Sequence, residues 1–152
     1  MPNHCDQQVY IHGDKNIVEE LYNNLKREDP RFCDLVIPMP LSESENWYEW
    51  RWKNWGTKWD VVDVYITDGI EKDGGKAWFT FNCWTAWGAP IPVWDKLHAM
   101  GVEVQAEYQD EGGMFEGEYH HGEDRSWQPE IEEEGLEDTI NIFKNLLKET
   151  VA

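Results

Sequence analysis

Two stretches of regular alternation constrain the fold of this chain more than any other feature of its sequence. Such alternation predicts a strand, in which successive side chains point to opposite faces. In residues 76–84 one face carries Ala77, Phe79, Phe81 and Cys83, and the other carries Trp78, Thr80, Asn82 and Trp84. In residues 102–109 one face carries Val102, Val104, Ala106 and Tyr108, and the other carries Glu103, Gln105, Glu107 and Gln109. The second stretch predicts a strand with one wet face.

The same reasoning assigns the rest of the chain. Strands are predicted over residues 5–12, 32–37, 60–67, 76–84, 102–109 and 114–120. Helices are predicted over residues 14–27, 42–56, 90–101 and 136–151. Asp14 is expected to cap the first helix, and Ser42 with Glu45 has the spacing of a capping box at the second. The glycines of residues 68–75 and 112–113 predict hairpin turns.

Apolar positions at helical spacing predict which helix faces are buried. Val93, Trp94, Leu97 and Met100 are expected to point inward. Tyr48, Trp52, Trp55 and Trp59 fall on one helical face, which we interpret as covering the sheet. Gly56 is expected to end that helix.

The order of these elements predicts an α+β fold with a mostly antiparallel sheet and helices on one face. A ferredoxin-like core over residues 1–122 is the simplest match, with a Trp-rich helical insert at residues 41–59. Residues 123–135 are interpreted as an acidic linker or loop. Residues 136–152 are interpreted as an amphipathic C-terminal helix that packs on the same domain.

Composition indicates a folded, soluble protein. Hydrophobic residues make up 40% of the 152 residues and include ten tryptophans, too much apolar material for a disordered chain even at a net charge of −18. Cys5, Cys33 and Cys83 form no disulfide framework, which suits a reducing cytoplasm. We expect no signal peptide in the first residues, and no apolar run reaches the ~18 residues of a membrane span.

The negative charge is concentrated in residues 103–138, where fourteen acidic side chains face Arg125 alone, a net charge of −13. Such a field attracts basic proteins and repels phosphate, so a long nucleic acid is not an expected partner. The alternative is a solvated acidic surface that keeps the chain in solution. The predicted partner-binding surface consists of Glu103, Glu107, Asp110, Glu111, Glu116, Glu118, Glu123, Asp124, Glu130, Glu132, Glu133 and Glu134.

A second candidate site is an aromatic and basic segment, because indoles stack on bases and cations bind phosphates. It would hold a small nucleotide, such as a signalling nucleotide. Core packing of the same tryptophans is the favoured interpretation. The candidate ligand platform is Trp47, Trp50, Arg51, Lys53, Trp55 and Lys58.

Catalytic chemistry finds little support in the sequence. Glu116, Glu118 and His120 would share one strand face and could bind a divalent metal, as in a metal-dependent enzyme. An exposed strand end is the alternative. No G-x-S-x-G motif and no Gly-rich phosphate loop is present, so neither a catalytic residue nor a cofactor is predicted.

Several sequence blocks resemble one known family. They are Pro2-Asn3-His4, residues 36–40, the block Asn54-Trp55-Gly56-Thr57-Lys58-Trp59-Asp60, residues 79–81 with 85–90, and residues 111–117. Together they look like the YubB-type ferredoxin-like family of bacteriophages and conjugative plasmids. The resemblance spans roughly residues 2–122. It implies a ferredoxin-like fold without an iron–sulfur cluster and a mobile-element origin, and it implies no reaction.

These features lead to one functional hypothesis and two alternatives. We expect a non-enzymatic phage or plasmid accessory protein of the bacterial cytoplasm. Its acidic surface would imitate nucleic acid and bind a host protein that handles nucleic acid or serves defence. The first alternative is nucleotide binding by the Trp-rich segment, and the weaker second is the metal-dependent enzyme.

Overall fold

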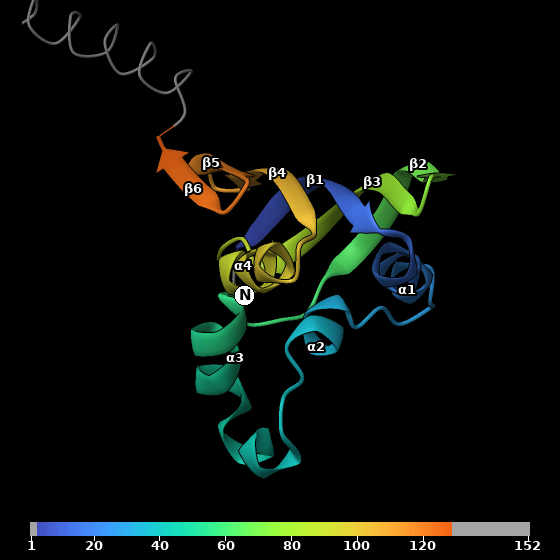
Figure 1. The fold of residues 1–152 in the computed structure, drawn as a ribbon. Helices are drawn as coiled ribbons and strands as arrows, with labels where there is room; N and C mark the ends of the chain where they lie inside the picture. Colours follow the sequence, from blue (N-terminus) through green and yellow to red (C-terminus); the bar gives the residue numbers. More distant parts are fainter. Residues whose placement is uncertain (1–2, 129–152) are drawn as a thin grey trace, which may run out of the picture.

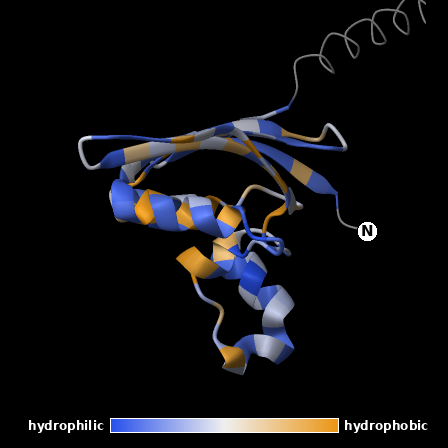
Figure 2. Cartoon of the chain, turned by 90° about the vertical axis from the view of Figure 1, so that its right-hand side faces the viewer, coloured by the Kyte–Doolittle hydropathy of each residue, from blue (hydrophilic) through white to orange (hydrophobic). Residues whose placement is uncertain are grey.

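The computed structural model describes residues 3–128 of the chain. One sheet is built from the alternating segments, and the helices lie against one of its faces (Figures 1 and 2). In chain order the elements are β1 (His4–Asp14), α1 (Lys15–Leu25), α2 (Phe32–Val36), η1 (Leu41–Asn46), α3 (Trp47–Trp55), β2 (Val62–Asp73), β3 (Lys76–Ala86), α4 (Ile91–Ala99), β4 (Glu103–Asp110), β5 (Glu116–His120) and β6 (Glu123–Trp127).

The sheet has six strands in the order β2-β3-β1-β4-β5-β6, and every neighbouring pair is antiparallel. β1 lies inside the sheet, between β3 and β4, and its alternate side chains are buried on the face that the helices cover. The prediction of an α+β fold with a mostly antiparallel sheet is therefore confirmed. So is the prediction that the helices share one face (Figure 2).

The core lies between this sheet and the helices α1, α2 and α4. Asp14 caps α1 as predicted, since its carboxylate accepts the backbone N–H groups of Asn16 and Ile17. Val93, Trp94 and Leu97 of α4 are buried, but Met100 is 46% exposed and its predicted inward position is wrong. α4 ends at Ala99, so Met100 does not continue the inward face of the helix.

The strand predicted over residues 32–37 is wrong, because these residues form α2. No local side chain caps this helix. Instead, the carboxylate of Asp60 accepts the N–H groups of Cys33 at 2.8 Å and Asp34 at 3.0 Å. A residue distant in the sequence thus satisfies the free donors of the first turn.

The Trp-rich segment also differs from its prediction. Ser42 and Glu45 lie within the 3-10 helix η1, not in a capping box. α3 runs from Trp47 to Trp55, and Gly56 ends it as predicted, with a left-handed φ of +76°. α3 packs on α4 and η1 and lies away from the sheet (Figure 1). Trp52 is 48% exposed, so the predicted cover of the sheet by this helix face is wrong.

Two segments predicted as turn or linker belong to strands. β2 continues to Asp73, and only Gly74 and Gly75 form the turn to β3. Residues 123–127, predicted as linker, form β6 on the edge of β5. All five residues of β6 are exposed, so its sequence carries no alternation that could have revealed it.

β2 is an edge strand with an irregular ladder to β3. Its register shifts between Val62 and Tyr65, between Ile66 and Asp68, and between Asp68 and Glu71. Such bulges twist and bend an edge.

The predicted C-terminal helix and residues Glu130, Glu132, Glu133 and Glu134 lie outside the described residues. None of the helices within residues 3–128 is long and apolar enough to cross a bilayer.

Candidate functional site

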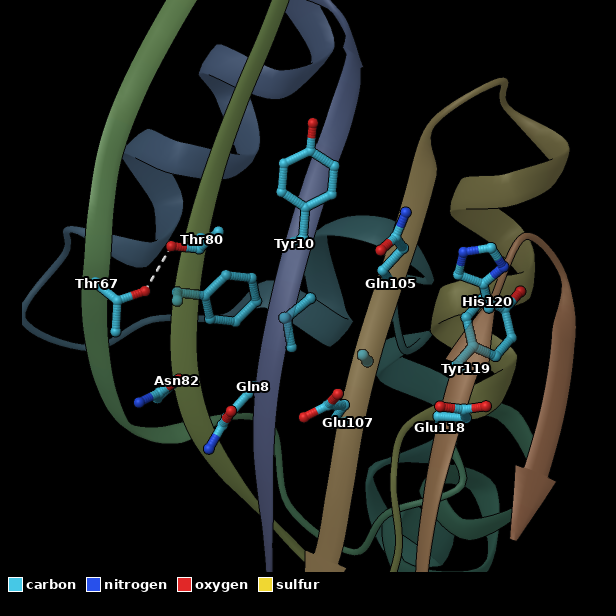
Figure 3. A pocket seen from close by; sticks show the side chains of 13 residues that line it. Gln8, Tyr10, Thr67, Thr80, Asn82, Gln105, Glu107, Glu118, Tyr119 and His120 are labelled. Atoms are coloured by element: carbon cyan, nitrogen blue, oxygen red, sulfur yellow. Dashed lines mark hydrogen bonds between the residues drawn. The ribbon is translucent and has the colours of Figure 1, made fainter.

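The face of the sheet opposite the helices carries the candidate site, and we call it the helix-free face. It consists of the outward-pointing residues of the strands. Antiparallel partners share a face, so the register arranges these residues in rows across the sheet. Figure 3 shows Gln8, Glu107 and Glu118 on neighbouring strands of this face.

Three rows cross all six strands. The first row is Tyr65, Asn82, Gln8, Glu107, Glu118 and Arg125. The second is Asp68, Thr80, Tyr10, Gln105, His120 and Glu123. The third is Val62, Trp84, Asp6, Gln109, Glu116 and Trp127.

The charge on this face is strongly one-sided. On β1, β4, β5 and β6 its only permanently positive side chain is Arg125. On β3 this face carries Thr80 and Asn82, and Thr80 bonds to Thr67 (Figure 3) and to Asp68 of β2. The carboxylates of the acidic side are Asp6, Glu103, Glu107, Glu116, Glu118 and Glu123.

One pair of carboxylates is placed directly opposite each other. Glu107 of β4 pairs with Glu118 of β5 in the ladder, so their side chains leave the same face side by side. Cross-strand partners have Cβ atoms about 5 Å apart, and like charges in this position destabilise a sheet. No salt bridge within residues 3–128 involves either carboxylate.

Two of the shallow hollows on this face adjoin both Gln8 and Glu107. The larger, about 440 Å³, lies over its centre and is lined by Gln8, Tyr10, Asn82 and Glu107 among others (Figure 3). The smaller, about 290 Å³, is lined by four carboxylates and the Trp127 indole, whose Nε1 donates to Glu116 Oε1 at 2.7 Å. Those carboxylates are Asp6, Glu107, Glu116 and Glu118.

The structure divides the predicted acidic surface. Glu103, Glu107, Glu116, Glu118 and Glu123 lie on the helix-free face. Asp6 belongs there as well and is missing from the prediction. The alternation of residues 5–12 already contains this signal, because Asp6 shares its phase with Gln8 and Tyr10.

Three other residues of the predicted surface lie elsewhere. The prediction that Asp110 belongs to the partner-binding surface is wrong. Asp110 is only 7% exposed, points inward from β4, and accepts the N–H of Met114. Glu111 is bound to His4, whose backbone and imidazole N–H donors lower the pKa of the Glu111 carboxyl. Asp124 accepts a short hydrogen bond from the Tyr108 hydroxyl, on the helix side of the sheet.

The alternative metal site at Glu116, Glu118 and His120 is not formed. Within residues 3–128 no group of three or more His, Cys, Asp or Glu side chains could hold a metal ion. Residues at i, i+2 and i+4 of a strand share a face, but the outer two are about 14 Å apart, too far for all three to bind one ion. Glu116 instead accepts the Trp127 N–H.

The residues of the predicted aromatic platform do not share one surface. Trp55 is buried and donates its Nε1 proton to the Ile37 carbonyl at 2.8 Å, so its ring cannot stack on a ligand. The Arg51 guanidinium lies over the rings of Trp47 and Trp55. Trp50 packs edge-on against Trp55 and, with Lys53, lines a separate hollow near Glu49.

Lys58, the last member of that platform, lies in an aromatic cage. Its ammonium is over the rings of Trp47, Tyr48 and Trp87. Trp87 is absent from the prediction because it follows β3, far from the Trp-rich segment in sequence.

Comparisons with known proteins assign no family. No protein-family model and no curated protein matches the sequence. The structure is similar to the crystal structure of protein Api92 from Yersinia pseudotuberculosis, of the family DUF1281, at a TM-score of 0.46 and 13% sequence identity. The similar part covers 64% of this chain and 39% of the other, so the chain spans less than half the length of that protein.

Proposed function

We propose that this protein is a non-enzymatic binding module that docks a basic partner protein onto its helix-free face. The observation that carries the proposal is the direct pairing of Glu107 with Glu118 in the middle of the acidic side. A like-charge pair of this kind costs about 0.2–1 kcal/mol of stability. The cost is reversed when a lysine or arginine of a partner lies between the two carboxylates.

The surroundings of this pair support the same proposal. The hollow beside it adds Asp6 and Glu116, together with the indole of Trp127. A planar guanidinium can donate hydrogen bonds to carboxylates and stack on an indole at once, so arginine suits this surface better than lysine. Arg125 follows Glu118 in the row but forms no salt bridge with it in the described part of the chain.

The fold supports a more specific version. Strands β1 to β4 in the order β2-β3-β1-β4, with α1 and α4 as crossovers, follow the ferredoxin-like pattern. We therefore propose a ferredoxin-like core, extended by β5 and β6 and interrupted by η1 and α3. With the YubB-type resemblance, this points to a phage or plasmid accessory protein. Its carboxylates would take the place of nucleic-acid phosphates on a host nucleic-acid-handling or defence protein.

The test removes one carboxylate and measures two quantities. Glu107→Gln should raise the free energy of unfolding by about 0.2–1 kcal/mol at low salt, because it ends the repulsion with Glu118. The same change should weaken binding of an oligoarginine peptide several-fold, measured by calorimetry, with affinity falling steeply as salt rises.

Glu20→Gln is the matched control, since Glu20 is exposed on α1, on the helix side of the sheet. It removes the same charge without touching the helix-free face. If Glu107→Gln and Glu20→Gln bind the peptide equally well, the helix-free face is not the docking surface.

A further inference from the structure

The cage around Lys58 has the geometry of a cation-binding site. The Lys58 Nζ lies 5.4 Å from the ring centroids of Tyr48 and Trp87 and 6.0 Å from that of Trp47. The Tyr48 ring is nearly perpendicular to both indoles, at 76° to Trp47 and 75° to Trp87. Three rings therefore present walls to one ammonium group.

Three separate segments build this cage. Trp47 and Tyr48 come from the first turn of α3, Lys58 from the loop before β2, and Trp87 from the residue after β3. Trp52 supports the third wall, with its ring 5.8 Å from that of Trp87. An arrangement that converges from distant parts of the sequence is not a by-product of one helical stripe.

The backbone of Trp87 is strained in the direction that forms the cage. Its φ of +71° is in the left-handed region, which bulky side chains rarely adopt and which costs about 1–3 kcal/mol. The Trp87 N–H donates to the Asn3 carbonyl at 2.9 Å, and the Thr85 hydroxyl donates to the Gly88 carbonyl. These bonds hold the strained turn.

The occupant of the cage is held by the rings and not by a carboxylate. Among residues 3–128 no salt bridge involves Lys58. The walls remain open to solvent, because Trp47 is 36% and Tyr48 41% exposed. A primary ammonium is strongly hydrated, whereas a quaternary ammonium presents methyl groups that pack on aromatic faces while its charge is attracted to them.

We infer that this cage is a binding site for a quaternary ammonium group, and that Lys58 occupies it in the free protein. A ligand of the choline or trimethyl-lysine type displaces the Lys58 side chain. The site is independent of the helix-free face, and its ligand differs from the basic surface proposed there.

The experiment uses choline as the probe and tryptophan fluorescence as the readout. Lys58→Ala empties the cage and should bind choline about tenfold more tightly than the natural protein, if Lys58 fills the cage about nine-tenths of the time. The neutral isostere 3,3-dimethylbutan-1-ol should not bind to either protein, because it lacks the charge. Sodium chloride at equal concentration controls for ionic strength.

Two further variants make the result decisive. Lys53→Ala removes an exposed lysine of α3 and should leave choline affinity unchanged. Tyr48→Ala combined with Lys58→Ala removes one exposed wall without opening the core and should abolish binding. The inference is overturned if Lys58→Ala binds choline no better than Lys53→Ala, if the neutral isostere binds as well as choline, or if loss of Tyr48 has no effect.

Discussion

The Tyr108 side chain crosses β5 at Gly117, which has no Cβ atom. A Cβ atom at Gly117 would lie 2.5 Å from the Tyr108 Cζ and hydroxyl oxygen and 2.6 Å from the Arg125 carbonyl. The tyrosine hydroxyl reaches Asp124 through this gap and thereby joins β4 to β6. Gly117 is buried, and the contacts of Tyr108 give a steric reason for a glycine here that the sequence alone does not contain.

Gly117→Ala should therefore destabilise the protein by about 1–3 kcal/mol, the usual range for overpacking, in chemical denaturation. Gly69→Ala in β2 is the control, since its Cβ atom would make only an ordinary contact with the Tyr22 hydroxyl at 3.5 Å. Equal stability of the two variants would contradict the steric account.

The three cysteines are buried and should be chemically inert in the native state. Burial, with Asp110 and Asp6 nearby, raises the pKa of Cys5 to about 12, and burial raises the pKa values of Cys33 and Cys83 as well. Since the thiolate is the reactive form, iodoacetamide at pH 8 should leave all three unmodified by mass spectrometry. In denaturant all three should be alkylated, and modification of the native protein would show that a thiol is accessible.

At the scale of elements, α2 depends on Asp60 more than on its own sequence. Asp60→Ala removes the acceptor of the Cys33, Asp34 and Val61 N–H groups and should cost about 2 kcal/mol of unfolding free energy. Asp60→Asn retains one acceptor oxygen and should cost less. Glu28→Ala, a change at an exposed residue shortly before α2, should leave the free energy of unfolding unchanged. If Glu28→Ala and Asp60→Ala lower the free energy of unfolding equally, the Asp60 cap does not stabilise α2.

The strands show where sequence reasoning succeeds. β1, β3, β4 and β5 were predictable because alternation is local to each strand. α2 and β6 were not, because the first needs the Asp60 cap and the second needs pairing with β5. A short apolar run without a cap is equally consistent with a strand.

The candidate sites, too, were predictable only where they depend on local spacing. The shared face of Glu116 and Glu118 follows from their spacing, but the opposition of Glu107 and Glu118 requires the register of β4 against β5. The cage required the strained φ of Trp87, which no local pattern encodes because the residue is neither glycine nor asparagine.

At the scale of the whole molecule, the net charge of −18 opposes folding through self-repulsion. Raising ionic strength shortens the screening length from about 30 Å at 0.01 M to about 8 Å at 0.15 M. Tm should therefore rise with sodium chloride in differential scanning calorimetry, while docking of a basic partner weakens. The rise should be smaller in Glu107→Gln, and a Tm that falls with salt would contradict a repulsive native state.

The irregular β2 edge has a consequence for the behaviour of this aromatic-rich chain at high concentration. Amyloid-like growth needs a straight edge whose free N–H and C=O groups meet those of an incoming strand at regular intervals. The three register shifts along β2 interrupt that spacing, and Asp63, with φ of +49°, turns the backbone at its start. The edge is therefore a poor template for fibril growth.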